Sequence, residues 1–327
     1  MAFVPRENIS RLWSSVYNSI VEDLKNQKKP RLKLKLLNTV LRYKDPIVEV
    51  FVGYKKLEMF LSQKTPQFYA LFETYDRALP RICEAIQKID KGLVIIDIGA
   101  NIGDTASLIS EKIGGASILC IEGNDKYLHF LNRNIKSIEN NTVIVEPFFC
   151  ADTIDNNQLS IESHNGTAHL SFSSTGDTLE NMDTLDNIIE RNKKFKETNL
   201  LKIDTDGFEL AVISGAKELL KEKHPMIFFE FTPEAYIANK QNPMDLIELL
   251  KYLGYNQALF YDNFGVPVGI YEFKDMMNIQ NMINKIDKKK IYYYDILCIH
   301  TEDECKYISV LERELNCVNN MEQKNGI

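Results

Sequence analysis

Acidic side chains follow apolar runs at several places in this 327-residue chain, and such acids can bind a cationic ligand or accept a proton. Asp97 and Glu122 each come directly after four apolar residues, at positions 93–96 and 118–121. Apolar runs of this kind are typical of strands buried on both faces of a parallel sheet. Because the carboxyl ends of parallel strands meet at one edge of a sheet, we expect the two carboxylates to lie close together.

The turn after the first predicted strand has the spacing Asp-x-Gly-x-x-x-Gly, from Asp97 through Gly99, Ala100 and Asn101 to Gly103. A dinucleotide-binding turn has glycine where this chain has Asp97, and a carboxylate there would repel a pyrophosphate. The same carboxylate suits S-adenosylmethionine, which carries a sulfonium and an ammonium group and no phosphate. We therefore predict that these five residues bind S-adenosylmethionine and that NAD does not bind, although Asp97 alone could also be an ordinary capping residue.

Two further acids match the order of the remaining parts of this cofactor. Glu122 follows Gly103 by about 20 residues, the usual spacing of a ribose-binding carboxylate in such folds. Asp152 lies in a turn after a third predicted strand at 142–145, where it could accept a hydrogen bond from the adenine amino group. The order Asp97, Glu122, Asp152 thus predicts contacts with the methionine end, the ribose and the adenine.

Two later apolar runs also carry acids near their ends. Residues 200–209 predict a fourth strand that leads into an acid-rich turn, and residues 226–231 predict a fifth strand. In an open α/β sheet the ligand lies at the carboxyl ends of the strands, near the point where the strand order reverses. Asp204, in the fourth strand's turn, should therefore face the same crevice as Asp97.

We predict that Asp204 is the general base, or the group that orients an acceptor hydroxyl, with Lys202, Asp206 and Glu230 as its neighbours. Methyl transfer from a sulfonium needs mainly alignment and one base, so no nucleophilic cysteine is required. Asp204 could instead cap the helix that follows it. The acids could also gather a divalent metal, but no histidine lies close to them in sequence, and we predict no metal.

Strand-like and helix-like segments must alternate around these residues to bring them together. They do so throughout residues 75–300, which predicts an α/β protein with a Rossmann-like, seven-stranded, mostly parallel sheet. Residues 1–74 predict an N-terminal appendage of helices and a β-hairpin, and residues 301–327 predict a charged tail. An inserted hairpin within residues 153–178 is expected over the active site.

The chain resembles the FkbM family of S-adenosylmethionine-dependent methyltransferases over residues 75–235, roughly half of its length. The resemblance rests on Tyr75-Asp76-Arg77, Ile96-Asp97-Ile98-Gly99-Ala100-Asn101-Ile102-Gly103, Ile121-Glu122, Leu201-Lys202-Ile203-Asp204-Thr205-Asp206-Gly207 with Glu209, and Phe229-Glu230. The family commonly has Glu in place of Asp206, and its members mostly methylate hydroxyl groups of sugars or natural products. The resemblance therefore implies a small-molecule or glycan acceptor that is methylated on oxygen. It also implies the class I methyltransferase form of the Rossmann-like fold.

Two rival functions are compatible with the same residues. A methyltransferase acting on nitrogen in protein or RNA is one, although the Asn-Pro-Pro-Tyr type of motif expected for many amine substrates is absent after the fourth strand. The other is a protein that binds the cofactor without catalysis, and the three cofactor acids argue against it.

The overall composition restricts the partners. The net charge of −7 argues against a general nucleic-acid binder. No apolar run reaches the length of a membrane span, and the N-terminus lacks the pattern of a secretion signal, so we expect a cytoplasmic protein. The cysteines lack Cys-x-x-Cys spacing, and those beside apolar runs are expected to be buried free thiols.

One basic segment stands out from this acidic background. Its basic residues are Lys25, Lys28, Lys29, Arg31, Lys33 and Lys35. They could face an anionic substrate or a membrane surface, or they could simply form a solvated face.

Overall fold

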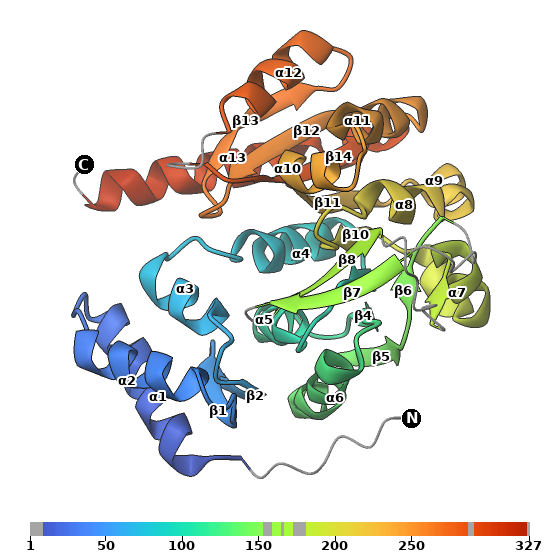
Figure 1. The fold of residues 1–327 in the computed structure, drawn as a ribbon. Helices are drawn as coiled ribbons and strands as arrows, with labels where there is room; N and C mark the ends of the chain where they lie inside the picture. Colours follow the sequence, from blue (N-terminus) through green and yellow to red (C-terminus); the bar gives the residue numbers. More distant parts are fainter. Residues whose placement is uncertain (1–8, 153–158, 165–166, 173–180, 287–290, 326–327) are drawn as a thin grey trace.

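The computed structural model describes residues 9–152, 159–164, 167–172, 181–286 and 291–325 (Figure 1). Its centre is an eight-stranded sheet in the order β13-β12-β14-β11-β10-β3-β4-β5. The strands are β3 (Val94–Ile98), β4 (Ser117–Ile121), β5 (Thr142–Glu146), β10 (Leu200–Ile203), β11 (Met226–Phe231), β12 (Tyr255–Asp262), β13 (Pro267–Glu272) and β14 (Tyr294–His300). Neighbouring strands from β5 to β11 are parallel, and β14 is antiparallel to both β11 and β12.

This arrangement confirms the predicted Rossmann-like fold of class I methyltransferases, with one correction to the strand count. The prediction had seven strands, whereas β13 adds an eighth that pairs antiparallel with β12 at the edge of the sheet. Pro267 at its start and Gly269 within it hide the strand pattern in the sequence. Proline is tolerated there because an edge strand has unpaired backbone groups on one side.

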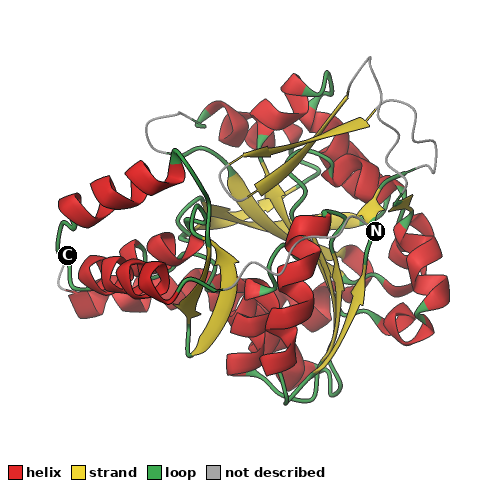
Figure 2. Ribbon diagram, turned by 60° about the horizontal axis from the view of Figure 1, so that its bottom comes forward, coloured by secondary structure: helices red, strands yellow, loops and turns green. Residues whose placement is uncertain are grey.

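Helices cover both faces of the sheet (Figure 2). One core contains side chains of β3 such as Ile95 together with α4 (Ala78–Ile89), α5 (Asp104–Lys112), α6 (Asp125–Asn134) and α13 (Glu304–Asn325). The other contains Ile96 and the helices α7 (Leu185–Arg191), α8 (Glu209–Ser214), α9 (Lys217–Lys223), α10 (Pro233–Ala238), α11 (Pro243–Tyr252) and α12 (Met276–Asn284). Successive residues of a strand point to opposite faces, so both faces of these strands are apolar.

Two helical predictions need correction. The helix expected over 208–222 is divided into α8 and α9 at Gly215, where an added Cβ would lie 2.1 Å from the carbonyl oxygen of Ala151. Residues 301–327, expected as a charged tail, contain α13, in which Tyr307, Val310 and Leu311 are buried. Their spacing forms one apolar face, which the charged composition of this segment conceals.

The N-terminal appendage consists of α1 (Arg11–Lys25), α2 (Arg31–Leu41), the hairpin of β1 (Ile47–Val52) and β2 (Lys55–Phe60), and α3 (Thr65–Leu71). The predicted helices and hairpin are thus confirmed, while the boundary at residue 74 stays a prediction. The core of the appendage includes Ile102, Leu108, Tyr127 and Phe130 from the region of α5 and α6. The appendage therefore packs against α5, which follows β3, and α6, which follows β4.

The predicted insertion contains the antiparallel hairpin of β7 (Leu159–His164) and β8 (Thr167–Phe172). It lies between two short strands that pair in parallel, β6 (Phe149–Cys150) and β9 (Met182–Asp183). Residues 153–158, 165–166 and 173–178 of the insertion lie outside the described residues, so its expected place over the active site stays a prediction. None of the helices in the described part of the chain combines the length and apolar composition needed to cross a lipid bilayer.

Candidate functional site

A cavity of about 230 Å³ lies at the carboxyl ends of β3, β4, β10 and β11. Its wall includes seven carboxylic acids: Asp76, Asp104, Glu122, Asp204, Asp206, Glu230 and Asp295. Among the described residues that line it, Lys202 is the only basic one. Such a wall favours a ligand that carries positive charge.

The glycine turn after β3 shapes one side of this cavity. The backbone N–H groups of Gly99 and Ala100 both donate to the carbonyl oxygen of Ile121, at 3.0 and 3.1 Å. Gly99 has a φ of +75°, and an added Cβ would lie 1.9 Å from the carbonyl oxygen of Asp204. Only glycine fits there, and the turn brings Gly99 and Asn101 to the cavity wall.

Two other residues of the turn, Ala100 and Gly103, lie away from the cavity wall. Ala100 is buried, and Gly103, with a φ of +82°, is the residue from which α5 begins. Neither is among the described residues that line the cavity. Their predicted contact with the cofactor stays a prediction, whereas their part in forming the turn is visible.

Asp97 lies one layer behind the wall, where it pairs with Lys202. The Lys202 Nζ is 3.0 Å from Asp97 Oδ1 and 3.2 Å from Asp204 Oδ2. It also donates to the carbonyl oxygen of Gly99 at 3.2 Å. Asp97 is fully buried, and neither of its oxygens has a well-formed hydrogen bond with the described residues, so Lys202 supplies most of the compensation for its charge.

The electrostatics of this pair follow from burial and proximity. Burial opposes the charge of Lys202, but Asp97 and Asp204 outweigh burial and raise the pKa of the ammonium group. Burial also raises the pKa of Asp97, and Lys202 counteracts part of this rise. The structure thus connects two predicted residues, Asp97 and Asp204, through one buried cation.

Glu122 has the position expected of a ribose-binding carboxylate. Its Oε2 accepts the N–H of Asn101 at 2.9 Å, and its Oε1 accepts the N–H of Asn124 at 2.8 Å. Burial raises the pKa of Glu122 to about 7, although these two amides favour the charged form. Each oxygen keeps a further lone pair, so the carboxylate can also accept hydrogen bonds from a ligand in the cavity.

The next part of the wall is aromatic and apolar. It is formed by Phe148, Phe149 and Cys150, which follow β5. Asp152 is exposed and is not among the described residues that line the cavity. Its predicted bond to adenine stays a prediction, and the sequence analysis did not single out the two phenylalanines.

The opposite part of the wall gathers the predicted acceptor residues. Desolvation, together with the nearby charges of Asp204 and Glu209, raises the pKa of Asp206 to about 8. Burial also raises the pKa of Glu230, whose Oε1 accepts a hydrogen bond from the Thr232 hydroxyl at 2.8 Å. Asp204 is the most accessible of the predicted group, because 44% of its side chain is exposed.

Three acids of this wall, Asp76, Asp104 and Asp295, were missed as site residues. Desolvation, together with the nearby charges of Asp104 and Asp204, raises the pKa of Asp76 to about 7. Asp295 of β14 lies opposite Glu230 of β11 in the sheet, and burial raises its pKa as well. The motif Tyr75-Asp76-Arg77 could have pointed to Asp76, because the motif is part of the family resemblance. No local pattern marks Asp295, because only the sheet order places it beside Glu230.

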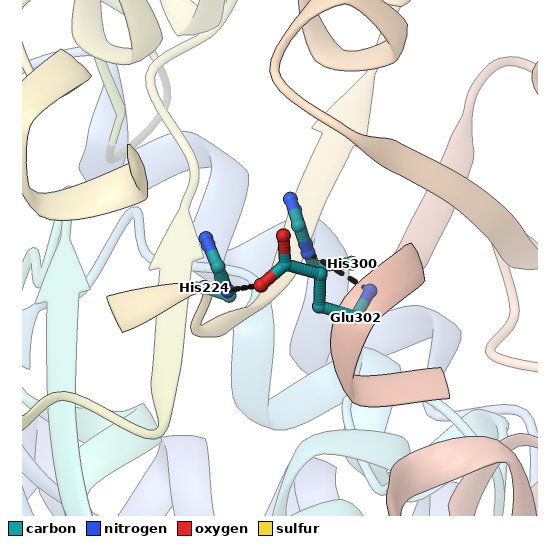
Figure 3. A group of neighbouring side chains, drawn as sticks. All are labelled: His224, His300 and Glu302. Atoms are coloured by element: carbon teal, nitrogen blue, oxygen red, sulfur yellow. Dashed lines mark hydrogen bonds and ion pairs between the residues drawn. The ribbon is translucent and has the colours of Figure 1, made fainter. Parts of the chain in front are cut away.

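A separate histidine group (Figure 3) lies where β11 begins and β14 ends. The rings of His224 and His300 stack with centroids 3.7 Å apart, and His224 Nδ1 is 3.7 Å from Glu302 Oε2. Nδ1 of His300 accepts the N–H of Glu302 at 3.1 Å, and Nε2 of His224 is 3.0 Å from the carbonyl oxygen of Lys221. The bond from Glu302 to His300 caps the short helix η3 (Thr301–Asp303), so we assign the group a structural role.

Comparison with known proteins agrees with this site. Residues 97–257 match the methyltransferase FkbM domain. The chain carries an FkbM methyltransferase domain. This match agrees with the family, the methyltransferase activity and the methyl donor S-adenosylmethionine predicted from the sequence. A search of curated protein sequences found no match.

Solved structures with related folds include another FkbM protein. Methyltransferase FkbM from Methylobacillus flagellatus KT is 17% identical, with 51% of this chain and 40% of that chain covered and a TM-score of 0.34. Magnesium protoporphyrin IX methyltransferase from Synechocystis PCC 6803 is 10% identical over 69% of this chain and 78% of that chain, with a TM-score of 0.39. This chain thus spans less than half the length of the FkbM protein to which it is similar.

Proposed function

We propose that this FkbM domain transfers a methyl group from S-adenosylmethionine to a hydroxyl group of a saccharide or natural-product acceptor. The observation that carries the proposal is the acid-lined cavity, in which the Glu122 side of the wall and the Asp204 side face one space. Cofactor and acceptor can then lie side by side, which methyl transfer requires. The family resemblance supports a hydroxyl as the acceptor group.

Glu122, Gly99 and Asn101 would hold the cofactor. Glu122 would accept hydrogen bonds from the ribose hydroxyls, and the backbone of the glycine turn would lie against the methionine end. When bound, S-adenosylmethionine supplies an electrophilic methyl group on a positively charged sulfur. The surrounding carboxylates would stabilise that charge before transfer.

Asp204 would receive the proton of the acceptor hydroxyl as the new bond to carbon forms. Desolvation and the neighbouring acids raise the pKa of Glu230, and they raise the pKa of Asp206 to about 8. Protonated carboxyl groups can donate hydrogen bonds to the acceptor, whereas a base must be unprotonated. Asp204 Oδ2 lies 3.2 Å from the Lys202 Nζ, and 44% of the Asp204 side chain is exposed. This division of roles supports Asp204 as the base.

An amine acceptor is the second candidate, because one observation favours it. The acids on the Asp204 side of the cavity would attract a protonated amine as well as a sulfonium. The same acids would repel the phosphates of RNA, so a protein or an amino sugar fits this alternative better than RNA does.

Transfer of isotope-labelled methyl groups to fractionated cell extracts tests the proposal. The fractions are glycan, lipid, protein and RNA, and the methylated atom is identified by mass spectrometry and NMR. We expect label on oxygen in the glycan or small-molecule fraction, and we expect the active protein on the cytoplasmic side of the membrane in its native cells. Label on nitrogen in protein or RNA would refute the hydroxyl proposal. Cofactor binding with no labelled product in any fraction would favour a non-catalytic protein.

A further inference from the structure

The segment from residue 25 to residue 44 carries a strong local positive charge. It contains eight basic residues and no acidic residue, in a chain with a net charge of −7. The basic residues are Lys25, Lys28, Lys29, Arg31, Lys33, Lys35, Arg42 and Lys44. We call residues 25–44, which include α2 and the turn before it, the basic surface. Nothing in the proposed methyl transfer uses this charge.

Large apolar side chains stand out from the same surface. Leu32 is 84% exposed, Leu36 is 49% exposed and Tyr43, just after α2, is 85% exposed. Leu32 and Leu36 are four residues apart and therefore share one side of the helix. Leu37 is the buried residue of α2, and Lys33 pairs with Asp23 of α1, so the other side of α2 faces the protein. The exposed leucines have no role in the core.

A groove of about 700 Å³ adjoins this surface, between the turn after α1 and helix α3. Four of its lining residues are basic: Lys25, Lys28, Lys29 and Arg31. None of these four makes an ion pair with the residues that the structure describes. Their charges are therefore available to an anionic partner.

We propose that the basic surface binds the anionic face of a lipid bilayer, with α2 lying in the plane of the interface. A helix that presents basic residues next to exposed leucines and a tyrosine has the composition of interfacial helices. A soluble anion would need only the basic residues, and the exposed leucines would then have no partner. The combination of positive charge and exposed apolar side chains therefore favours a membrane surface over a free phosphate compound.

The basic surface lies close to the methyl-transfer cavity. Tyr69 lines the groove, and its hydroxyl is 2.9 Å from Asp104 Oδ2 and 3.2 Å from Asp76 Oδ2. Both of these acids line the cavity. A bilayer bound at the basic surface would thus lie on the Tyr69 side of the active site. The binding itself does not depend on the identity of the acceptor.

Co-sedimentation with lipid vesicles tests the proposal on the full-length protein. We expect binding to vesicles of phosphatidylcholine mixed with phosphatidylglycerol, no binding to phosphatidylcholine alone, and loss of binding as salt is raised. Each basic residue near an anionic surface is worth about 1 kcal/mol, or about fivefold in binding. The double variant Lys28→Gln/Lys29→Gln should therefore bind about 25-fold more weakly, and Leu32→Ser should bind about tenfold more weakly.

Matched variants far from α2 provide the controls. Lys217→Gln/Lys251→Gln removes the same charge from α9 and α11, and Met277→Ser removes a 76% exposed apolar side chain from α12 (Figure 1). Both should bind vesicles like the parent, and all variants should keep the parent's thermal stability because they change exposed side chains. Equal binding by the parent and Leu32→Ser would overturn the proposal in favour of a soluble anion. Equal binding to both kinds of vesicle would also overturn it.

Discussion

Replacing Glu122 by alanine should weaken cofactor binding and loosen the cavity at the same time. The carboxylate accepts two backbone N–H groups, from Asn101 at 2.9 Å and from Asn124 at 2.8 Å, and it is 7% exposed. Each buried donor left without a partner costs about 1–3 kcal/mol, so the two together should lower the free energy of unfolding by about 2–6 kcal/mol. The lost bonds to ribose should weaken S-adenosylmethionine binding at least tenfold, since hydrogen bonds to a charged group are worth about 1.5–3 kcal/mol.

Calorimetric titration with S-adenosylmethionine measures the affinity, and thermal unfolding without ligand measures the stability. Glu146→Ala is the matched control, because Glu146 ends the neighbouring strand β5 and bonds Asn192 at 2.6 Å without lining the cavity. It should leave the affinity unchanged. If folded Glu122→Ala bound the cofactor as tightly as the parent, Glu122 would not be the ribose carboxylate, and the cofactor would lie elsewhere.

Two further predictions concern the charges of the site. Burial raises the pKa values of Asp76 and Glu122 to about 7 and of Asp206 to about 8. Their protonated forms stabilise the free protein in acid and lose this effect as pH rises through 7–8, so the free protein should melt at a lower temperature at pH 8 than at pH 6. A cationic ligand favours the ionised forms of these acids, so the affinity for S-adenosylmethionine should rise over the same pH range, and calorimetry should detect proton release on binding. The product S-adenosylhomocysteine has an uncharged sulfur, so an equally steep pH dependence of its affinity would count against this prediction. Lys202→Met should destabilise the fold by about 3–5 kcal/mol in chemical unfolding because Asp97 is left buried and unpaired, and adding Asp97→Asn should restore part of the loss. Full stability of Lys202→Met would show that Asp97 does not depend on this pair.

The residues at strand ends could be predicted because two local signals coincide there. An apolar run predicts a buried strand, and an acid directly after it predicts a side chain at the open edge of the sheet, as for Glu122 and Asp204. The helices of the appendage were equally readable from their apolar spacing. Local pattern was sufficient wherever one element alone determines the position of a side chain.

The remaining features depend on contacts between distant parts of the chain. Asp295 enters the site because β14 pairs with β11, and no spacing in the sequence reveals that neighbour. Asp97 pairs with Lys202 because the pairing of β3 with β10 places Lys202 directly beside it, and its predicted contact with the ligand stays a prediction. The strand β13 was missed because Pro267 and Gly269 interrupt its apolar pattern.

The most direct test of the proposed mechanism compares Asp204→Asn with Glu230→Gln, using an acceptor found in the labelling screen. Both changes keep the size of the side chain, and both residues line the same cavity. General-base catalysis is typically worth about 10² to 10⁴ in rate, so Asp204→Asn should lower kcat by about 10² or more while cofactor affinity stays near that of the parent. Turnover by Asp204→Asn at the parent rate, with Glu230→Gln inactive, would contradict the account and assign the base to β11.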